Sequence, residues 1–152
     1  MRKKGLPLSL AAAAAVLFVA ALPVPGDESH SEHAATFDRC AKACNDCQRA
    51  CDSCATHCAN LVASGRKEHL KTLKTCQDCA SFCATAAQIV ARQGAFTDLI
   101  CKSCAEACAR CGKACEQHPD DKHMKMCAEQ CRACEQACRE MLKHVGETGE
   151  EK

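Results

Sequence analysis

The sequence predicts an all-α protein, an antiparallel four-helix bundle with a cysteine-lined core. Three observations support this fold class. The chain of 152 residues contains 18 cysteines, and within each segment they are spaced three or four residues apart, which places them on one face of a helix. The residues between them are mostly strong helix formers such as Ala, Glu, Lys, Gln and Arg. Apart from Gly112, glycine and proline stand outside four such segments or at their ends, where they limit helices.

The first 26 residues have the composition of a secretory signal peptide. A basic start at residues 2–4 precedes an alanine-rich apolar stretch from Leu8 to Leu22, and Pro23 follows it. The stretch is shorter than the ~20 apolar residues that a membrane-spanning helix needs, although an uncleaved anchor is the alternative. We therefore expect cleavage of residues 1–26, export to the bacterial periplasm and no membrane attachment afterwards.

Two helices are predicted in the first half of the mature chain. Residues 27–35 form a polar lead-in, which we interpret as flexible and solvated, and in which His30 and His33 are potential surface ligands. The bundle itself is expected over residues 36–146. Its first helix is predicted over residues 37–63, with Thr36 as the N-cap and Gly65 just beyond its end. The second is predicted over residues 66–93, ending before Gly94.

Two further helices are predicted in the second half. The third covers residues 97–117 and ends before His118 and Pro119. The fourth covers residues 119–145, with Pro119 in its first turn and Gly146 after its end. Residues 147–152 are acidic, and we expect this tail to be disordered.

The cysteines occupy the positions that leucine normally fills in a helical bundle. In the first helix they follow one another at alternating intervals of four and three residues, which is an unbroken heptad seam, and the other helices repeat the pattern. Core-facing thiolates are therefore the predicted metal ligands: Cys40, Cys44, Cys47, Cys51, Cys54, Cys58, Cys76, Cys79, Cys83, Cys101, Cys104, Cys108, Cys111, Cys115, Cys127, Cys131, Cys134 and Cys138.

Disulfide bonds are the structural alternative, as in most small exported proteins with many cysteines. Within a helix they are unfavourable, because side chains three or four residues apart have Cβ atoms about 5–6 Å apart, while a disulfide needs about 3.5–4.5 Å. A metal ion that bridges two sulfur atoms spans the larger distance. Thiolates select soft ions, and continuous rows of sulfur favour Cu(I) over the closed four-ligand sites typical of zinc.

Charge and composition exclude other classes of function. The net charge is +1 and the chain has neither Trp nor Tyr, so it lacks the basic stripe and the stacking surface of a nucleic-acid-binding protein. The sequence contains no Ser-His-Asp order, phosphate-binding loop or dinucleotide fingerprint. We therefore expect no enzymatic activity and no nucleic-acid partner.

The cysteine pattern resembles that of the cysteine-rich four-helix-bundle copper storage proteins. The residues that carry the resemblance are the seam from Cys40 to Cys58 and its repeats from Cys101 to Cys115 and from Cys127 to Cys138. It covers essentially the whole mature chain. The resemblance implies that the bundle binds multiple Cu(I) ions on core thiolates, assembles as a homotetramer and supplies copper to an accepting protein whose identity is open.

Extending the heptad register beyond the cysteines predicts how each end of the core is closed. One end, at the start of the first and third helices and the end of the second and fourth, collects apolar residues such as Phe37, Phe96, Leu99 and Met141. We expect ordinary hydrophobic packing there. The opposite end collects imidazoles and thioethers, which bind Cu(I) more exchangeably than thiolate pairs. We expect it to be the mouth through which copper loads, with these candidate ligands: His69, His118, Met124, His57, His123 and Met126.

Two other functions remain open at this point. One is a zinc- or cadmium-scavenging protein that resembles a metallothionein, and the other is a metal-free thiol redox buffer.

Bound metal would also stabilise the fold. Large apolar side chains are scarce outside the leader, and cations bound to the thiolates would link the helices.

Overall fold

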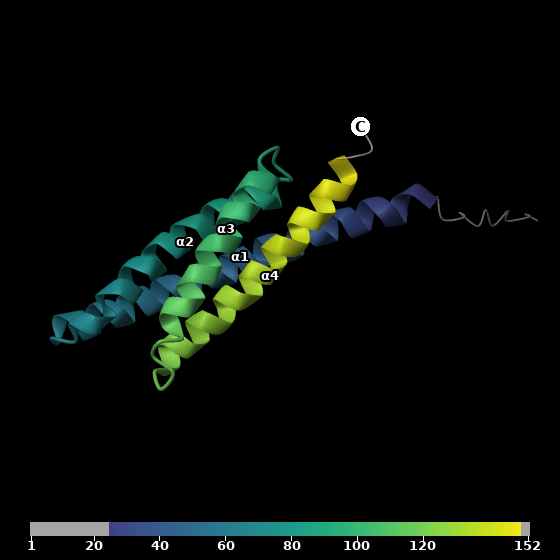
Figure 1. Cartoon of the computed structure of the whole chain (residues 1–152). Helices are drawn as coiled ribbons and strands as arrows, with labels where there is room; N and C mark the ends of the chain where they lie inside the picture. Colours follow the sequence, from purple (N-terminus) through teal and green to yellow (C-terminus); the bar gives the residue numbers. More distant parts are fainter. Residues whose placement is uncertain (1–24, 150–152) are drawn as a thin grey trace, which may run out of the picture.

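Four helices make up the bundle in the computed structural model, which describes residues 25–149 (Figure 1). They are α1 (Pro25–Ala63), α2 (Leu70–Ala91), α3 (Thr97–Cys115) and α4 (Lys122–Gly149), and a short 3₁₀ turn, η1 (Lys67–His69), precedes α2. The predicted all-α fold is confirmed, and the described part of the chain contains no strand. The expected signal peptide lies almost wholly outside the described residues, among which no helix is long and apolar enough to cross a membrane.

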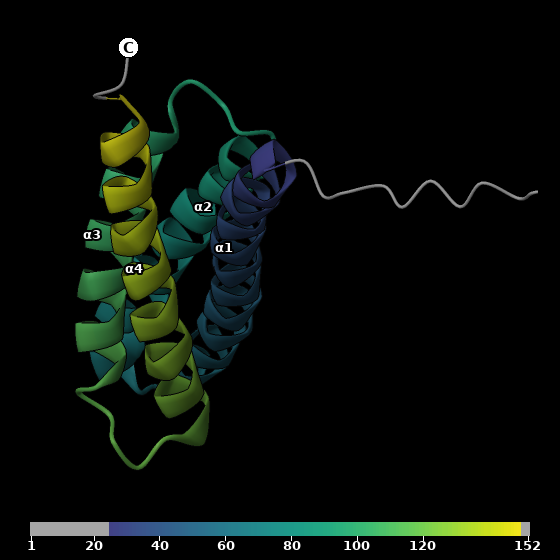
Figure 2. The ribbon, with the colours of Figure 1, turned by 90° about the vertical axis from the view of Figure 1, so that its right-hand side faces the viewer.

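Successive helices run in opposite directions, so the bundle has two chemically distinct ends. Figure 2 shows the beginning of α1, the end of α4 and the connection between α2 and α3 together at one end, which we call the proximal end. The connections from α1 to α2 and from α3 to α4 lie together at the opposite end, which we call the distal end. The cysteines of all four helices lie between these two ends.

Helix α1 begins earlier than predicted. The expected flexible lead-in, residues 27–35, is helical, since α1 starts at Pro25 and runs without a break to Ala63. No glycine or proline interrupts this stretch after Gly26, and His33 packs on Phe37 with ring centroids 4.8 Å apart. Thr36 is therefore not an N-cap: its hydroxyl donates a hydrogen bond to the Glu32 carbonyl one turn earlier.

Glycine ends α1, as the sequence predicts. Gly65 has φ of +95°, a conformation that side chains disfavour. The Arg66 N–H donates to the Leu61 carbonyl and the Gly65 N–H to the Val62 carbonyl, which is the hydrogen-bond pattern of a Schellman motif.

Helix α2 ends in the same motif, but the residue in the left-handed conformation is the one before Gly94. Gln93, with φ of +51°, adopts the left-handed conformation, and the Gly94 N–H donates to the Ile89 carbonyl. A Cβ atom at Gly94 would lie 3.0 Å from Cγ2 of Ile89. Close packing on Ile89, rather than backbone conformation, therefore requires the glycine at position 94.

Helix α4 begins at Lys122, not at Pro119. Asp121 caps it, because its Oδ1 atom accepts hydrogen bonds from the backbone N–H groups of His123 and Met124. The helix continues to Gly149, beyond the predicted end at Val145 and into the tail that we expected to be disordered; only residues 150–152 of that tail lie outside the described chain. Glycine at position 146 lies within the helix and does not end it.

The core consists of sulfur and small side chains. Every one of the 18 cysteines is buried, together with alanines such as Ala86 and Ala105. Large buried side chains lie at the two ends, with Met124 at the distal end and Phe37 and Met141 at the proximal end. The predicted hydrophobic plug at the proximal end is only partly formed, since Phe96 and Leu99 remain more than 60% exposed (68% and 62%). They are exposed because they begin α3 on its outer side.

Candidate metal centre

All 18 cysteines are free thiols whose side chains meet in the centre of the bundle. The heptad spacing explains this placement, because alternating steps of three and four residues keep the cysteines of each helix on its inner face. The cysteines predicted as ligands therefore form one continuous sulfur core.

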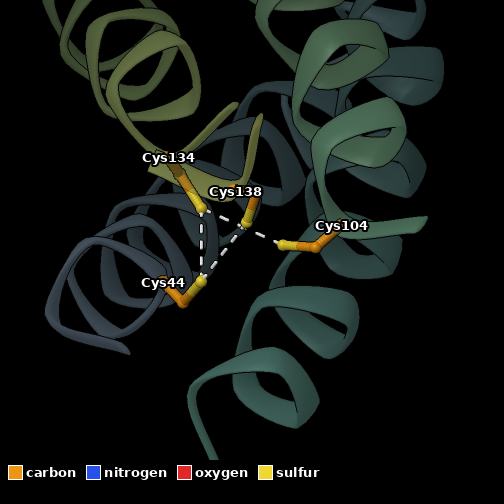
Figure 3. Close-up of side chains that lie close together, drawn as sticks. All are labelled: Cys44, Cys104, Cys134 and Cys138. Carbon is orange, nitrogen blue, oxygen red and sulfur yellow. Dashed lines mark hydrogen bonds between the residues drawn. The ribbon is translucent and has the colours of Figure 1, made fainter. Parts of the chain in front are cut away.

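Sulfur atoms from different helices approach one another closely. In the group that Figure 3 shows, Sγ of Cys44 on α1 lies 3.7 Å from Sγ of both Cys134 and Cys138 on α4, and Sγ of Cys104 on α3 lies 3.9 Å from that of Cys134. These separations are far longer than the S–S bond of about 2.05 Å, so the atoms are in contact but not bonded. They are the separations at which one metal ion can contact several sulfur atoms.

Several such groups of four cysteines follow one another along the core. In each, the four Sγ atoms lie within 4.8 Å of one another. Neighbouring groups share members: Cys47, Cys51, Cys127, Cys131 and Cys134 each belong to two of them. The sharing makes the core a chain of linked sites, in which one thiolate can bridge two ions.

Hydrogen bonds between the thiols give neighbouring cysteines different acidities. A hydrogen bond from Cys115 lowers the pKa of Cys111 to about 6, while a hydrogen bond with Cys111 raises the pKa of Cys131. At the distal margin of the core, burial raises the pKa of Cys58 to about 12. The metal-free core therefore contains both proton donors and thiolate-like acceptors, and metal binding must displace the protons that remain.

The distal end brings together two pairs of the predicted histidines. The rings of His69 and His118 have centroids 4.4 Å apart, and the rings of His57 and His123 stack with the same separation. Met124 lies fully buried next to the core, whereas Met126 is 64% exposed. The two histidine pairs thus lie at the end at which the sequence predicts them, whereas Met126 lies on the outer face of α4.

His69 carries an unused nitrogen at this end. Its side chain is buried, and Nδ1 has no hydrogen-bond partner among the described residues. Burial and the neighbouring His118 lower the pKa of His69, so its imidazole stays neutral. A neutral imidazole whose nitrogen has no hydrogen-bond partner can bind a metal ion.

Asp121 holds His57 of the other histidine pair in place and is not among the site residues predicted from the sequence. One of its oxygens caps α4, and the other, Oδ2, lies 2.7 Å from His57 Nε2. Burial raises the pKa of Asp121, but the hydrogen bonds from His57 and the Met124 backbone outweigh this effect and hold it below its usual range. An Asp that follows a proline at a helix start was the available signal.

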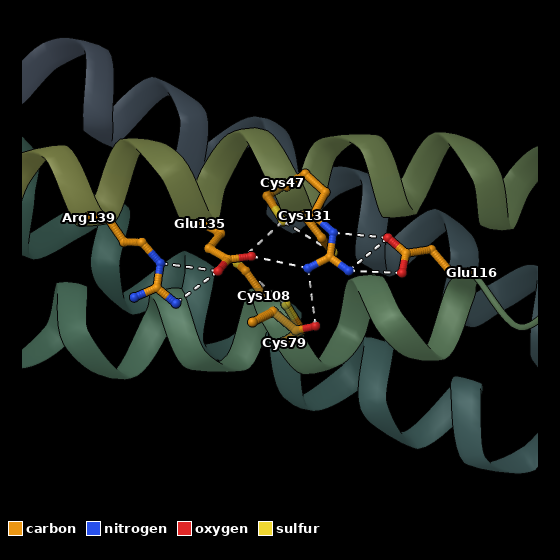
Figure 4. A network of polar contacts seen from close by, with 9 residues as sticks. Cys47, Cys79, Cys108, Glu116, Cys131, Glu135 and Arg139 are labelled. Carbon is orange, nitrogen blue, oxygen red and sulfur yellow. Dashed lines mark hydrogen bonds and ion pairs between the residues drawn. The ribbon is translucent and has the colours of Figure 1, made fainter.

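A polar network closes the seam between α3 and α4 outside the sulfur core (Figure 4). Arg132 donates two hydrogen bonds from Nη2, at 2.7 and 2.9 Å, to the two carboxylate oxygens of Glu116, and a third from Nη1 to Glu135 at 3.1 Å. Gly112 makes room for it, since a Cβ there would lie 3.1 Å from Cζ of Arg132. The guanidinium thus lies flat on α3 and covers this side of the core.

Comparison with known proteins establishes the family. A sequence model described as copper storage protein matches residues 33–143, which include every cysteine of the chain. This chain belongs to the copper storage protein family. The family is named for copper storage, in line with the absence of enzyme motifs noted above. A comparison with curated proteins gives no match.

Solved structures of copper storage proteins resemble this bundle closely. A cytosolic copper storage protein from Streptomyces lividans, loaded with five coppers, is 33% identical; the match covers 74% of this chain and 97% of that one, with a TM-score of 0.64. The Cu(I)-bound copper storage protein BsCsp3 is 34% identical over 70% of this chain and 98% of its own, with a TM-score of 0.65. Metal-free Csp3 from Bacillus subtilis is 35% identical over 68% and 96%, with a TM-score of 0.60.

These relatives bear on two predictions. Cu(I) as the bound metal is confirmed at the level of the family, since relatives are Cu(I)-bound and copper-loaded. The expected export to the periplasm is contradicted, because a relative that matches nearly along its whole length is a cytosolic protein. Physically, a core of free thiols matches a reducing compartment, whereas an oxidising one favours disulfides.

Proposed function

We propose that this protein stores many Cu(I) ions per chain on the thiolates of its core. The observation that carries the proposal is the row of linked four-cysteine groups, each with its sulfur atoms within 4.8 Å of one another. An isolated binding site would need only one such group. Shared cysteines allow bridging thiolates, which suit a soft univalent ion, and capacity is then on the order of one ion per cysteine, up to ~18 per chain.

Charge balance supports Cu(I) as the stored ion. Each ion that binds a thiol displaces one proton, so a thiol and a Cu⁺ ion become a neutral copper thiolate. A core filled with one ion per thiolate carries no net charge, which matters because buried charge is costly. Zn(II) held by four thiolates would leave two negative charges at each separate site.

Zinc remains the second candidate because the spacing also fits it. A tetrahedral ion with Zn–S bonds of about 2.3 Å requires sulfur atoms about 3.8 Å apart. The separations of 3.7 to 3.9 Å around Cys44 and Cys134 meet this requirement. Geometry alone therefore permits a divalent ion, and the number of ions bound distinguishes the two functions.

We further propose that copper loads at the distal end. His69 and His118 would receive the ion from solvent, with His57, His123 and the exposed Met126 around them, and the buried Met124 would pass it to the sulfur core. The unpaired Nδ1 of His69 and the burial of Met124 support this path. Imidazole and thioether ligands hold Cu(I) less firmly than thiolate pairs, so an ion would move inward along the path.

Assembly as a homotetramer and delivery to a copper-accepting protein complete the proposal. Sedimentation of the metal-free and loaded protein tests the assembly. The acceptor would be a protein whose own thiolates compete with this core for Cu(I).

The first test is an anaerobic titration of the reduced protein with Cu(I), in competition with a chromophoric Cu(I) chelator, with bound metal counted by mass spectrometry. We expect more than about ten tightly held ions per chain, since bridging thiolates share ions along the core. The control is the same titration in the presence of Zn(II). Uptake of only a few ions, displaced by Zn(II), would identify a zinc scavenger, and thiols that are oxidised on isolation would identify a redox buffer.

A further inference from the structure

The proximal end carries a histidine pair that the proposed loading path does not use. His33 Nδ1 on α1 and His144 Nε2 on α4 lie 2.8 Å apart, and the two ring centroids are separated by 4.7 Å. Both side chains are half-buried. The two residues are 111 positions apart in the sequence, so only the antiparallel packing of α1 and α4 creates this pair.

The pair is continuous with the sulfur core. On α1, His33, Phe37 and Cys40 follow one another at intervals of four and three residues, so His33 extends the heptad seam of the cysteines. On α4, Met141 lies one turn beyond Cys138, and His144 lies one turn beyond Met141. Cys40 and Cys138 are both buried and are the last core cysteines of α1 and α4 at this end.

Both ends of the bundle therefore present the same types of ligand. At the distal end the pair His69 and His118 stands outside a fully buried methionine, Met124. At the proximal end the pair His33 and His144 is followed inward by Met141, which is also fully buried. Imidazole, thioether and thiolate are all ligands that bind Cu(I), so each end offers a series of copper ligands from solvent to core.

We propose that the proximal end is a second copper port, in which His33 and His144 bind Cu(I) from solvent and Met141 passes it to Cys138 and Cys40. The port rests on the proposed storage function. It makes the sulfur core accessible from both ends, so that ions do not have to pass every occupied thiolate to reach the cysteines of the proximal half.

The binding step requires only local movement. An ion bonded to both nitrogens at about 2.0 Å needs them about 4 Å apart, so the two rings must separate by roughly 1 Å. His33 lies close to the beginning of α1, which projects beyond the rest of the bundle (Figure 1), and His144 lies in the last turns of α4. The movement must also displace the ring of Phe37, whose centroid lies 4.8 Å from that of His33 and 6.0 Å from that of His144.

The charge and proton balance of the port is simple. Two neutral imidazoles bind one Cu⁺ without releasing a proton, because the ring that donates the hydrogen bond moves its N–H to its other nitrogen by exchange with water. Transfer to Cys138 then breaks the two copper–nitrogen bonds and forms a copper–sulfur bond. The S–H bond breaks at the same time, and its proton goes to water. Copper remains in the Cu(I) state throughout.

The test compares loading rates of the full chain with one or both ends changed. His33→Phe combined with His144→Phe keeps both rings and removes their nitrogens, and His69→Phe combined with His118→Phe does the same at the distal end. Gln88→Phe is the control, because Gln88 is neutral and exposed and lies in the last turn of α2, at the same end of the bundle. Anaerobic stopped-flow measurements follow transfer of Cu(I) from a chromophoric chelate.

We expect either double variant to load about twofold more slowly than the wild type, since the two ports act in parallel, and the combined variant to lose most of its loading rate. In ¹⁵N spectra of protein whose core thiolates are already filled with Cu(I), one further equivalent should shift the imidazole signals of His33 and His144. A proximal variant that loads at the wild-type rate, or imidazole signals that do not move, would overturn the port. Equilibrium capacity is measured in the same samples: low capacity in the wild type refutes storage, whereas full capacity with unchanged rates refutes only the port.

Discussion

At the scale of single residues, the core differs from an ordinary helical bundle in what each side chain contributes. A buried leucine stabilises through its apolar area, at about 25 cal/mol per Å². A buried cysteine is smaller, and the hydrogen bonds between thiols such as Cys47 and Cys108, at 3.8 Å, are weak. Sulfur at these positions gives up stability of the metal-free fold for metal capacity.

At the distal end, His69 is a second residue that lowers the stability of the metal-free fold in favour of metal binding. Its buried Nδ1 has no hydrogen-bond partner among the described residues, and an unsatisfied buried polar atom costs about 1–3 kcal/mol. We predict that His69→Leu stabilises the metal-free protein by about 1 kcal/mol but slows Cu(I) loading without lowering its final capacity. Urea unfolding and stopped-flow loading measure the two effects.

The control for this substitution is Gln88→Leu, at an exposed position in the last turn of α2. It should leave both the stability and the loading rate close to those of the wild type. The lowered pKa of His69 also makes stability depend on pH. Because His69 binds a proton more readily in the unfolded chain than in the folded one, the free energy of unfolding falls as the pH drops below about 6.5. His69→Leu should remove this part of the pH dependence, and a less stable variant would contradict the assignment.

At the scale of elements, caps and turns decide where the helices begin and end, and hence which side chains meet at each end. The Schellman motif at Gly65 ends α1 close to His57, and the Asp121 cap starts α4 just before His123 and Met124. The distal histidine cluster thus depends on two helix termini as well as on the heptad seam.

Asp121 offers a test of this dependence. Asp121→Ala removes the acceptor of two backbone N–H groups and the partner of His57, and we predict a loss of about 1–2 kcal/mol in the free energy of unfolding of the metal-free protein. Asp121→Asn keeps the cap and should lose less. Urea unfolding at several pH values measures both variants.

The pH dependence of this comparison has a definite sign. The pKa of Asp121 is lowered in the folded state, so the carboxylate stabilises the protein at pH values above about 3.9, the ordinary value of an aspartate. Its advantage over asparagine should be present at neutral pH and disappear as the pH falls through the folded-state pKa. An advantage that grew on acidification would contradict the hydrogen bond to His57.

At the scale of the whole molecule, bound copper should act as the main link between the helices. The four-cysteine group around Cys44 draws ligands from α1, α3 and α4, so an ion bound there joins three helices at once. Repetition of such groups along the core would turn a weakly packed bundle into a cross-linked one.

We therefore predict a higher melting temperature for the Cu(I)-loaded protein than for the metal-free protein. A ligand that binds only the folded state at 100 times its dissociation constant adds about 2.7 kcal/mol per site, and many sites act together here. Anaerobic calorimetry of both forms measures the difference, and removal of copper by a chelator should restore the lower value. Equal melting temperatures would contradict the linking role.

Acid should reverse this stabilisation. Thiols such as Cys58, whose pKa is raised to about 12, bind protons strongly, and protons compete with copper for the same sulfur atoms. Copper retention and melting temperature should therefore fall together as the pH is lowered.

The fold class and the cysteine core can be predicted from the spacing of residues along the chain. The alternating spacing of cysteines leaves one inner face on each helix, and four such faces can be buried only against one another. The same register placed His69, His118 and Met124 at one end correctly. These inferences succeed because helical periodicity is a local property of the chain.

Contacts between side chains of different helices could not be predicted from this spacing, because they depend on how the helices pack. His33 looked like part of a flexible lead-in, but α1 extends to Pro25 and packs it against His144 of α4. Phe96 and Leu99 looked like parts of a plug, but α3 begins with both facing outward. The sharing of cysteines between neighbouring metal groups likewise depends on the crossing and axial offset of the helices. Periodicity specifies the face on which a residue lies, whereas its partners are set by packing between segments distant in sequence.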